Sequence, residues 1–144
     1  MFDKAFFNSE QKEIIKRAIQ EAELNTSGEI RVHLSKTCSE SVLDCASYWF
    51  EKLKMHKTIQ RNCILFFLAS NDKKFAVIGD VGINRKVEHD FWDHIKDNML
   101  LDFKNDRFTE GLVNGIQIVG KQLKQHYPNK KTKSNNLPDE ISES

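Results

Sequence analysis

The chain has 144 residues and a mass of 16.8 kDa, which is enough for one domain with a sizeable core. Its 22 basic and 21 acidic residues leave a formal net charge of +1, so no broad field favours nucleic acid or an acidic membrane surface. No apolar run approaches the roughly 20 residues of a membrane-spanning helix, and the N-terminal residues lack the pattern of a secretory signal. We therefore expect a cytoplasmic protein without nucleic acid partners or membrane insertion.

The first predicted element is a helix that begins near Asn8 or Ser9. Asn8 and Gln11 have the spacing of a capping box, and apolar residues follow at helical intervals on one face, namely Ile14, Ile15, Ala18, Ile19 and Ala22. Residues 25–28, Asn-Thr-Ser-Gly, have the turn chemistry that ends a helix. Polar and apolar side chains alternate over residues 29–34, which predicts the first strand.

A second helix and a buried strand follow. Thr37 and Glu40 have capping-box spacing, and the helix that they begin should end by about His56, with an apolar face of Val42, Cys45, Ala46, Trp49, Phe50 and Leu53. Residues 62–69 are almost entirely apolar, which predicts a central strand covered on both faces. The connection between the two strands has the length of a βαβ crossover, so we expect them to be parallel.

The remaining elements are a hairpin and two helices. Asn-Asp at 71–72 is typical of a hairpin turn, so residues 74–79 should return antiparallel to the central strand. The polar loop 79–84 leads into a third helix, whose inward face carries Phe91, Ile95 and Met99. A fourth helix is predicted from about residue 109 to residue 126.

Together these elements predict a single α/β domain over residues 1–127. We expect a small mixed sheet of three to four strands, built from a βαβ crossover followed by a hairpin, with about four helices on both faces. Residues 128–144 are polar and charged with almost no apolar side chains. Such a composition predicts a disordered tail.

The cysteines and histidines give no sign of a covalent or zinc framework. Cys38, Cys45 and Cys63 are an odd set without CxxC spacing, and Cys63 lies in the predicted core strand, so we expect free thiols. His89 and His94 are five residues apart, which turns their imidazoles to different faces of a helix. A zinc site is therefore not predicted.

The predicted topology brings three loops to one end of the sheet. Because the hairpin reverses the chain, the end of the third strand should lie beside the starts of the first two. Carboxylate, amide and carbonyl oxygens are hard ligands that favour Ca²⁺ or Mg²⁺ over zinc or copper. We predict a divalent-cation site at this end, with ligands drawn from Asp80, Asp90, Glu29, Asn62, Asn84 and Glu88.

Each of these residues also has a structural interpretation. Asp90 precedes an apolar helical run and would serve as a helix cap, and Asp80 would serve as a turn residue. Glu29 would form a surface pair with Arg31 or Arg61, which contributes little. Arg61 is either a phosphate-binding residue or a solvated side chain at the start of a strand.

Several short motifs resemble the TPM domain family. They are residues 26–32, 61–65 and 79–84, followed by Asp90-Phe91-Trp92 and by Phe108-x-x-Gly111-Leu112. The similarity runs from about Phe6 to Tyr127, and the family includes thylakoid-lumen proteins linked to photosystem II repair and many bacterial proteins. The resemblance implies an α/β sandwich, divalent-cation binding in some members, and acid phosphatase activity reported for plant members. It also implies functional positions at Asp80, Asp90, Glu29 and Asn62.

Three functions are consistent with these observations. The first, which we favour, is a divalent-cation-binding module. The second is a metal-assisted acid phosphatase acting on phosphomonoesters, with Arg61 steadying the developing charge. The third is a metal-independent domain that binds a protein partner through the same loops. The sequence contains no GxSxG, Walker A or GxGxxG motif, so covalent catalysis has no support.

Overall fold

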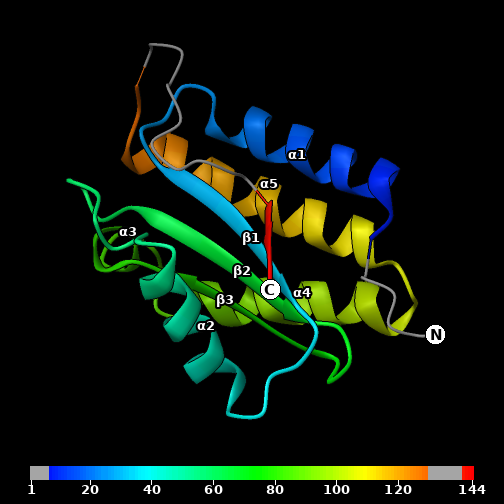
Figure 1. Ribbon diagram of the computed structural model, residues 1–144. Helices are drawn as coiled ribbons and strands as arrows, with labels where there is room; N and C mark the ends of the chain where they lie inside the picture. Colours follow the sequence, from blue (N-terminus) through cyan, green and yellow to red (C-terminus); the bar gives the residue numbers. More distant parts are fainter. Residues whose placement is uncertain (1–6, 130–140) are drawn as a thin grey trace.

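The computed structural model describes residues 7–129 and 141–144. This part of the chain contains a mixed sheet with the strand order β3-β2-β1-β4, formed by β1 (Glu29–Ser35), β2 (Cys63–Ala69), β3 (Lys74–Gly79) and β4 (Ile141–Glu143). The helices are α1 (Ser9–Glu23), α2 (Val42–Lys52), α3 (Val81–Asn84), α4 (Phe91–Lys104) and α5 (Phe108–His126). Figure 1 shows the sheet between these helices, so the predicted α/β class is confirmed.

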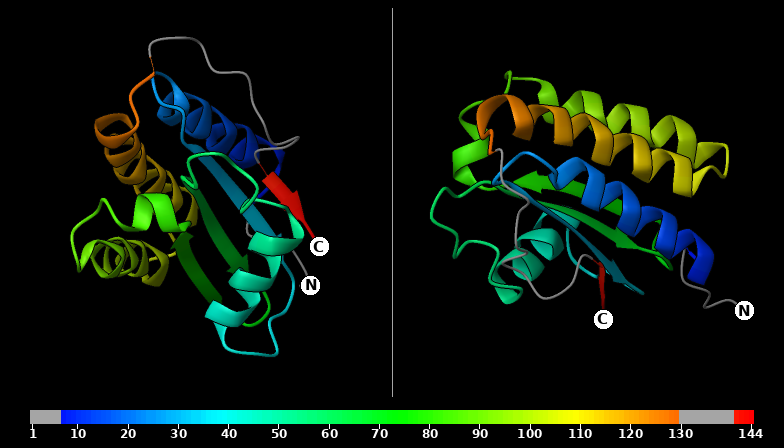
Figure 2. Two further views of the ribbon diagram at one scale, coloured as in Figure 1. Left: turned by 90° about the vertical axis from the view of Figure 1, so that its left-hand side faces the viewer. Right: turned by 90° about the horizontal axis from the view of Figure 1, so that it is seen from above.

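The helices form two unequal layers. α1, α4 and α5 cover one face of the sheet, and α2 covers the other (Figure 2). Successive side chains of a strand point to opposite faces, and the β2 side chains in the core under α1, α4 and α5 are Ile64, Phe66 and Leu68. Those in the core under α2 are Cys63, Leu65, Phe67 and Ala69. Every residue of β2 is 0% exposed, which confirms the predicted central strand.

Both predicted strand pairings are confirmed. β1 and β2 are parallel, with Glu29 opposite Cys63. β2 and β3 are antiparallel, with Ile64 opposite Gly79. The starts of β1 and β2 therefore lie at the same end of the sheet as the end of β3.

The predicted cap of the first helix is confirmed, whereas that of the second is wrong. Asn8 Oδ1 accepts a hydrogen bond from the Gln11 amide at 2.8 Å, and Gln11 Oε1 accepts one from the Asn8 amide at 2.9 Å. α2 instead begins after Ser41, whose side chain accepts from the Asp44 amide at 3.2 Å. α2 ends at Lys52, which agrees with the predicted end by about His56, because Lys54 has a positive φ of 59° that a helix does not continue.

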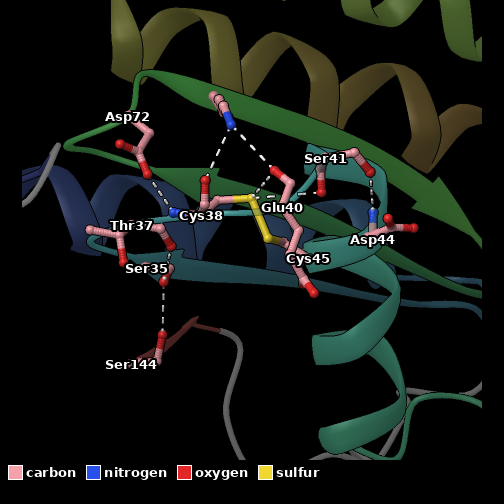
Figure 3. The surroundings of a disulfide bond; sticks show 10 residues. Ser35, Thr37, Cys38, Glu40, Ser41, Asp44, Cys45, Asp72 and Ser144 are labelled. Atoms are coloured by element: carbon pink, nitrogen blue, oxygen red, sulfur yellow. Dashed lines mark hydrogen bonds between the residues drawn. A yellow bond between two sulfur atoms is a disulfide. The ribbon is translucent and has the colours of Figure 1, made fainter.

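The expectation of free thiols is wrong for two of the three cysteines. Cys38 and Cys45 form a disulfide with Cα atoms 6.2 Å apart, and the buried Cys63 is free. Figure 3 shows this bond joining the loop after β1 to the first turn of α2. The Cys38 amide also donates to Asp72 Oδ2 at 2.5 Å. The hairpin turn thus holds Cys38 in a loop, and this tertiary contact displaces the capping box expected at Thr37.

The predicted disordered tail is wrong for its last residues. Ile141–Glu143 form β4, which pairs in parallel with β1 and places Val32 opposite Ile141. Lys12 Nζ lies 2.6 Å from Glu143 Oε2, and the Ser144 amide donates to the Leu34 carbonyl at 2.9 Å. The open edge of β1 thus accepts a strand too short to have a detectable sequence pattern. Residues 130–140 of the predicted tail lie outside the described residues.

A buried histidine lies on the α2-facing side of β1. His33 stacks on Trp49 with ring centroids 4.1 Å apart. Its Nδ1 lies 2.6 Å from Ser142 Oγ, and its Nε2 lies 3.0 Å from Ser144 Oγ. Burial, followed by the nearby charge of Arg31, lowers the pKa of His33 from 6.5 to about 4 against a smaller opposing effect of Glu143. His33 is therefore neutral in the folded protein at neutral pH.

Candidate functional site at one end of the sheet

Three loops meet where β1 and β2 begin and β3 ends, as the sequence predicts. We call this region the rim and define it as residues 26–29, 60–63 and 79–82. The strand register places Glu29, Cys63 and Gly79 at this end, and the Asp80 amide donates to the Cys63 carbonyl at 2.9 Å. The predicted convergence of the loops is therefore confirmed.

An ion pair between Arg61 and Asp80 connects two of the loops. Arg61 Nε and Nη2 donate to Asp80 Oδ2 and Oδ1 at 2.6 and 2.8 Å, which is the bidentate geometry of strong arginine–carboxylate pairs. Oδ1 also accepts from the Val81 amide at 2.7 Å, so Asp80 caps the short helix α3. The Asp80 side chain is 4% exposed and that of Arg61 is 44% exposed. The hydrogen bond to Asp80 raises the already high pKa of Arg61, and Arg61 stays charged.

A glycine allows the two loops to approach each other closely. The Gly82 amide donates to the Arg61 carbonyl at 2.8 Å, and Arg61 itself has a positive φ of 52°. A Cβ on Gly82 would lie 2.2 Å from the Gln60 carbonyl oxygen and 2.6 Å from that of Arg61. Because both are backbone atoms that cannot swing away, only glycine fits here.

Side chains join the loop at residues 26–29 to the loop at residues 60–63. Ser27 Oγ donates to Gln60 Oε1, and the Asn62 amide group donates to Ser27 Oγ at 3.1 Å. Asn62 is 2% exposed, so its amide serves as a buried connector. Gln60 is the member of this network that sequence analysis missed.

The other predicted ligands differ in their positions. Asn84 Oδ1 accepts from Trp92 Nε1 at 2.8 Å, and Glu88 is exposed in the loop before α4. Asp90 stands at the N-cap position of α4 without a side-chain cap bond, and its Oδ2 lies 3.3 Å from His94 Nε2. Glu29 is 2% exposed at the start of β1. The structure thus brings Asp80 and Asn62 into the rim network, whereas Glu88 and Asp90 face solvent.

The rim does not fit a closed cation site. Asp80 accepts three hydrogen bonds, which fill three of the about four acceptor positions of a carboxylate. Across residues 7–129 and 141–144 there is no group of three or more His, Cys, Asp or Glu side chains that could hold a metal ion. Ligation by the six predicted residues stays a prediction.

A cleft opens beside Asp80, between α2 and the end of β3. It has a volume of about 770 Å³, and four carboxylates line it, those of Glu40, Asp44, Glu51 and Asp80. The lining also includes Arg61, His56 and Tyr48. The four carboxylates and one guanidinium leave an excess of three negative charges. We call this region the acidic cleft.

Sequence analysis missed most of the acidic cleft, although a signal for it exists. Asp44, Tyr48 and Glu51 recur at intervals of four and three residues, which places them on one face of α2. This face is opposite the apolar face used to predict the helix. The position of this acidic face beside the end of β3 depends on how α2 packs on the sheet, and no local sequence pattern reveals that packing.

The architecture is that of a small α/β sandwich with polar loops gathered at one end. The sequence model of the TPM domain matches residues 1–122, so the chain belongs to the TPM domain family. No curated protein matches the chain. No helix in the described part of the chain is long and apolar enough to span a bilayer.

Solved structures agree with this assignment. The chain is similar to the BA42 protein from the psychrophilic bacterium Bizionia argentinensis, with a TM-score of 0.87 and 44% identity over 96% of each chain. It also resembles the N-terminal domain of a protein from P. gingivalis, with a TM-score of 0.65 and 15% identity over 85% of this chain and 81% of that one. The N-terminal domain of the cg2496 protein from Corynebacterium glutamicum has a TM-score of 0.62 and 11% identity over 90% and 78%. The last two similarities concern the fold alone.

Proposed function

We propose that the domain binds a hydrated divalent cation in the acidic cleft, with Mg²⁺ favoured over Ca²⁺. The observation that supports this proposal is the excess of carboxylates in the cleft. Among the described residues that line it, only Arg61 offsets four acidic side chains. Arg61 directs its charge at Asp80. The charges of Glu40, Asp44 and Glu51 are therefore left to attract a cation from solution.

The lack of a compact ligand cluster among the described residues supports the preference for Mg²⁺. Ca²⁺ takes about six to eight oxygen ligands, whereas Mg²⁺ keeps several of its waters and uses one or two carboxylates. Because no cluster of three or more ligating side chains is present among the described residues, an ion in this cleft would keep most of its water. Asp80 retains one acceptor position on Oδ2 toward such a hydrated ion.

The phosphatase alternative has no observation in its favour. Arg61 would have to bind the phosphate, yet two of its N–H groups point at Asp80. A phosphate there would share the guanidinium with a carboxylate and would meet the negative charges of the cleft. We therefore confine the proposal to cation binding.

An NMR titration of the amide signals with Mg²⁺, and separately with Ca²⁺, tests the proposal. We expect saturable shifts at residues 40–51 and 79–82, and tighter binding of Mg²⁺. The double variant Asp44→Asn, Glu51→Gln should weaken Mg²⁺ binding about tenfold or more, because affinity depends on the number of charged ligands. The matched control is Asp97→Asn, which removes an exposed carboxylate of α4 outside the cleft. If neither ion shifts these signals, or if the double variant binds as the unaltered chain does, the proposal is wrong.

A further inference from the structure

The two edges of the sheet differ in what covers them. The outer edge of β1 is paired with β4. β3 lies at the opposite edge, and within the described residues it pairs with β2 alone. An edge strand presents unpaired backbone groups that can accept another strand.

The register identifies the groups that β3 presents. Asp80 forms a hydrogen-bonded pair with Cys63, and in antiparallel sheets hydrogen-bonded and non-bonded pairs alternate along the strand. The β3 residues Ala76 and Ile78 therefore direct their N–H and C=O groups toward β2. The residues between and beside them direct these groups away from the sheet, and they are Phe75, Val77 and Gly79.

This edge lacks the usual devices that block strand addition. Charged residues and proline commonly protect exposed edges, yet β3 reads Lys-Phe-Ala-Val-Ile-Gly and carries only Lys74 as a charge. Lys74 turns away from the edge, since its Nζ donates to the carbonyls of Cys38 and Glu40 at 3.2 and 3.3 Å. The rest of the strand is uncharged and has no proline.

A groove of about 500 Å³ runs along the same edge, and we call it the edge groove. Leu43 at the start of α2 forms one wall, and Trp92 at the start of α4 forms the other. Leu43 is 60% exposed, so its side chain is accessible to a strand that pairs with β3. The groove therefore offers apolar contacts on both faces of any strand that pairs with β3.

The charges around the edge groove indicate the chemistry of its occupant. Ile78 and Gly79 line both the edge groove and the acidic cleft, so the two are continuous. A chain leaving the groove at Gly79 would enter the acidic cleft, whose excess of carboxylates favours a basic side chain. Within the groove the walls combine aliphatic and aromatic groups with one acidic and one basic side chain, Asp93 and Lys96. Because these two charges offset each other, the apolar walls favour alternate apolar residues.

We propose that the edge groove binds an extended segment of a partner protein as an additional strand on β3. The segment has aliphatic residues at alternate positions and a lysine or arginine at the end beside Gly79. Its backbone makes up to about six hydrogen bonds with the three outward-facing residues of β3, and its side chains contact Leu43 and Trp92. This binding does not depend on a cation in the acidic cleft.

Selection from a library of random heptapeptides displayed on phage tests the proposal, with the full chain as bait. The enriched peptides are then synthesised, and their Kd is measured by fluorescence polarisation. We expect alternating aliphatic residues with a basic end, and amide shifts at Phe75, Val77 and Gly79 on binding. Leu43→Ser should weaken binding at least about tenfold, the size of a lost interface anchor. The matched control Leu101→Ser removes a leucine that is 64% exposed outside the edge groove and should change nothing.

A backbone variant tests the strand pairing itself. Val77→Pro removes one outward N–H and leaves the hydrogen bonds to β2, so it should abolish peptide binding while circular dichroism stays unchanged. If Val77→Pro unfolds the chain, Leu43→Ser still decides. An empty selection, or peptides indifferent to Leu43→Ser, would overturn the proposal. Sedimentation that reveals a dimer through β3 would overturn it in favour of a second copy of this chain.

Discussion

The rim and the acidic cleft lie side by side, yet their polar groups have opposite surroundings. In the rim, Asp80 and Asn62 are buried and bonded to neighbouring loops. In the acidic cleft, Asp44 and Glu51 are exposed on one face of α2. We infer from this difference that the rim holds three loops together, whereas the cleft presents charge to a ligand. Substitutions in the two regions should therefore affect different measurements.

The largest expected effect is on folding and comes from the rim. Gly82→Ala places a methyl group against two backbone carbonyls, at 2.2 and 2.6 Å, and should lower the free energy of unfolding by about 3 kcal/mol. Denaturant unfolding measures this change. The control is Gly115→Ala, whose methyl group would meet the side chains of Met99 and Phe66 at 3.0 Å and no backbone atom within that distance. An equal effect of the two substitutions would show that the rim is not tightly joined.

His33 contributes to the pH dependence of the free energy of unfolding. This contribution must be removed before an acid titration can report on the carboxylates of the rim and the acidic cleft. The folded-state pKa of about 4 lies below the ordinary 6.5, so neutral His33 stabilises the fold above pH 6.5 and this stability is lost as the pH falls toward 4. The loss is at most about 1.4 kcal/mol for each pH unit. In the variant His33→Gln, the free energy of unfolding should change less steeply with pH in this window. An unchanged slope in that variant would assign the acid sensitivity to the carboxylates.

Asp80 should contribute to stability first and to cation binding second. Asp80→Ala removes the cap of α3 and the buried acceptor of Arg61, and should lower the free energy of unfolding by about 2 kcal/mol. Asp80→Asn keeps an oxygen for the Val81 amide and should cost less. Thermal melts of both variants measure the difference. Equal melting temperatures for the unaltered chain and Asp80→Ala would contradict a structural role.

The disulfide should affect both the stability of the fold and the acidic cleft moderately. It closes a loop with a sequence separation of 7 residues, and in the chain-entropy description its loss costs about 2 kcal/mol. The fold should survive because Lys74 and Asp72 also hold Cys38. Since Glu40 and Asp44 lie within this loop, the double variant Cys38→Ser, Cys45→Ser should also bind Mg²⁺ more weakly. Calorimetry measures both effects, and an unchanged affinity would show that the loop does not shape the cleft.

The smallest effect on stability should come from the acidic cleft. The double variant Asp44→Asn, Glu51→Gln changes exposed groups and should alter the free energy of unfolding by less than about 0.5 kcal/mol. Denaturant unfolding without added cation measures this. A larger loss would mean that these carboxylates support the fold, and the contrast between rim and cleft would disappear.

The sequence predicts the sheet better than it predicts the site. The apolar run at residues 63–69 and the turn at residues 71–72 are local signals, and they lead correctly to the meeting of three loops. The pairing of Arg61 with Asp80 depends on the positive φ of Arg61 and on the close approach of Gly82. Neither is visible in a pattern of residue types, so a buried ion pair could not be distinguished from a ligand.

The remaining errors have the same origin in tertiary structure. The Cys38–Cys45 disulfide requires the loop after β1 to fold back onto α2, and β4 requires a free edge on β1. Disulfides are most common in oxidising compartments, so this bond stands in contrast to the cytoplasmic location expected from the sequence. That location stays a prediction.

The position of the bound cation is tested most directly with Mn²⁺, which prefers oxygen ligands as Mg²⁺ does and broadens the NMR signals of nearby amides. If the ion occupies the acidic cleft, low concentrations of Mn²⁺ should broaden the amides of Asp44, Glu51 and Asp80 first, and excess Mg²⁺ should restore them. Broadening that begins at Glu88 and Asp90 and spares α2 would contradict a site in the cleft.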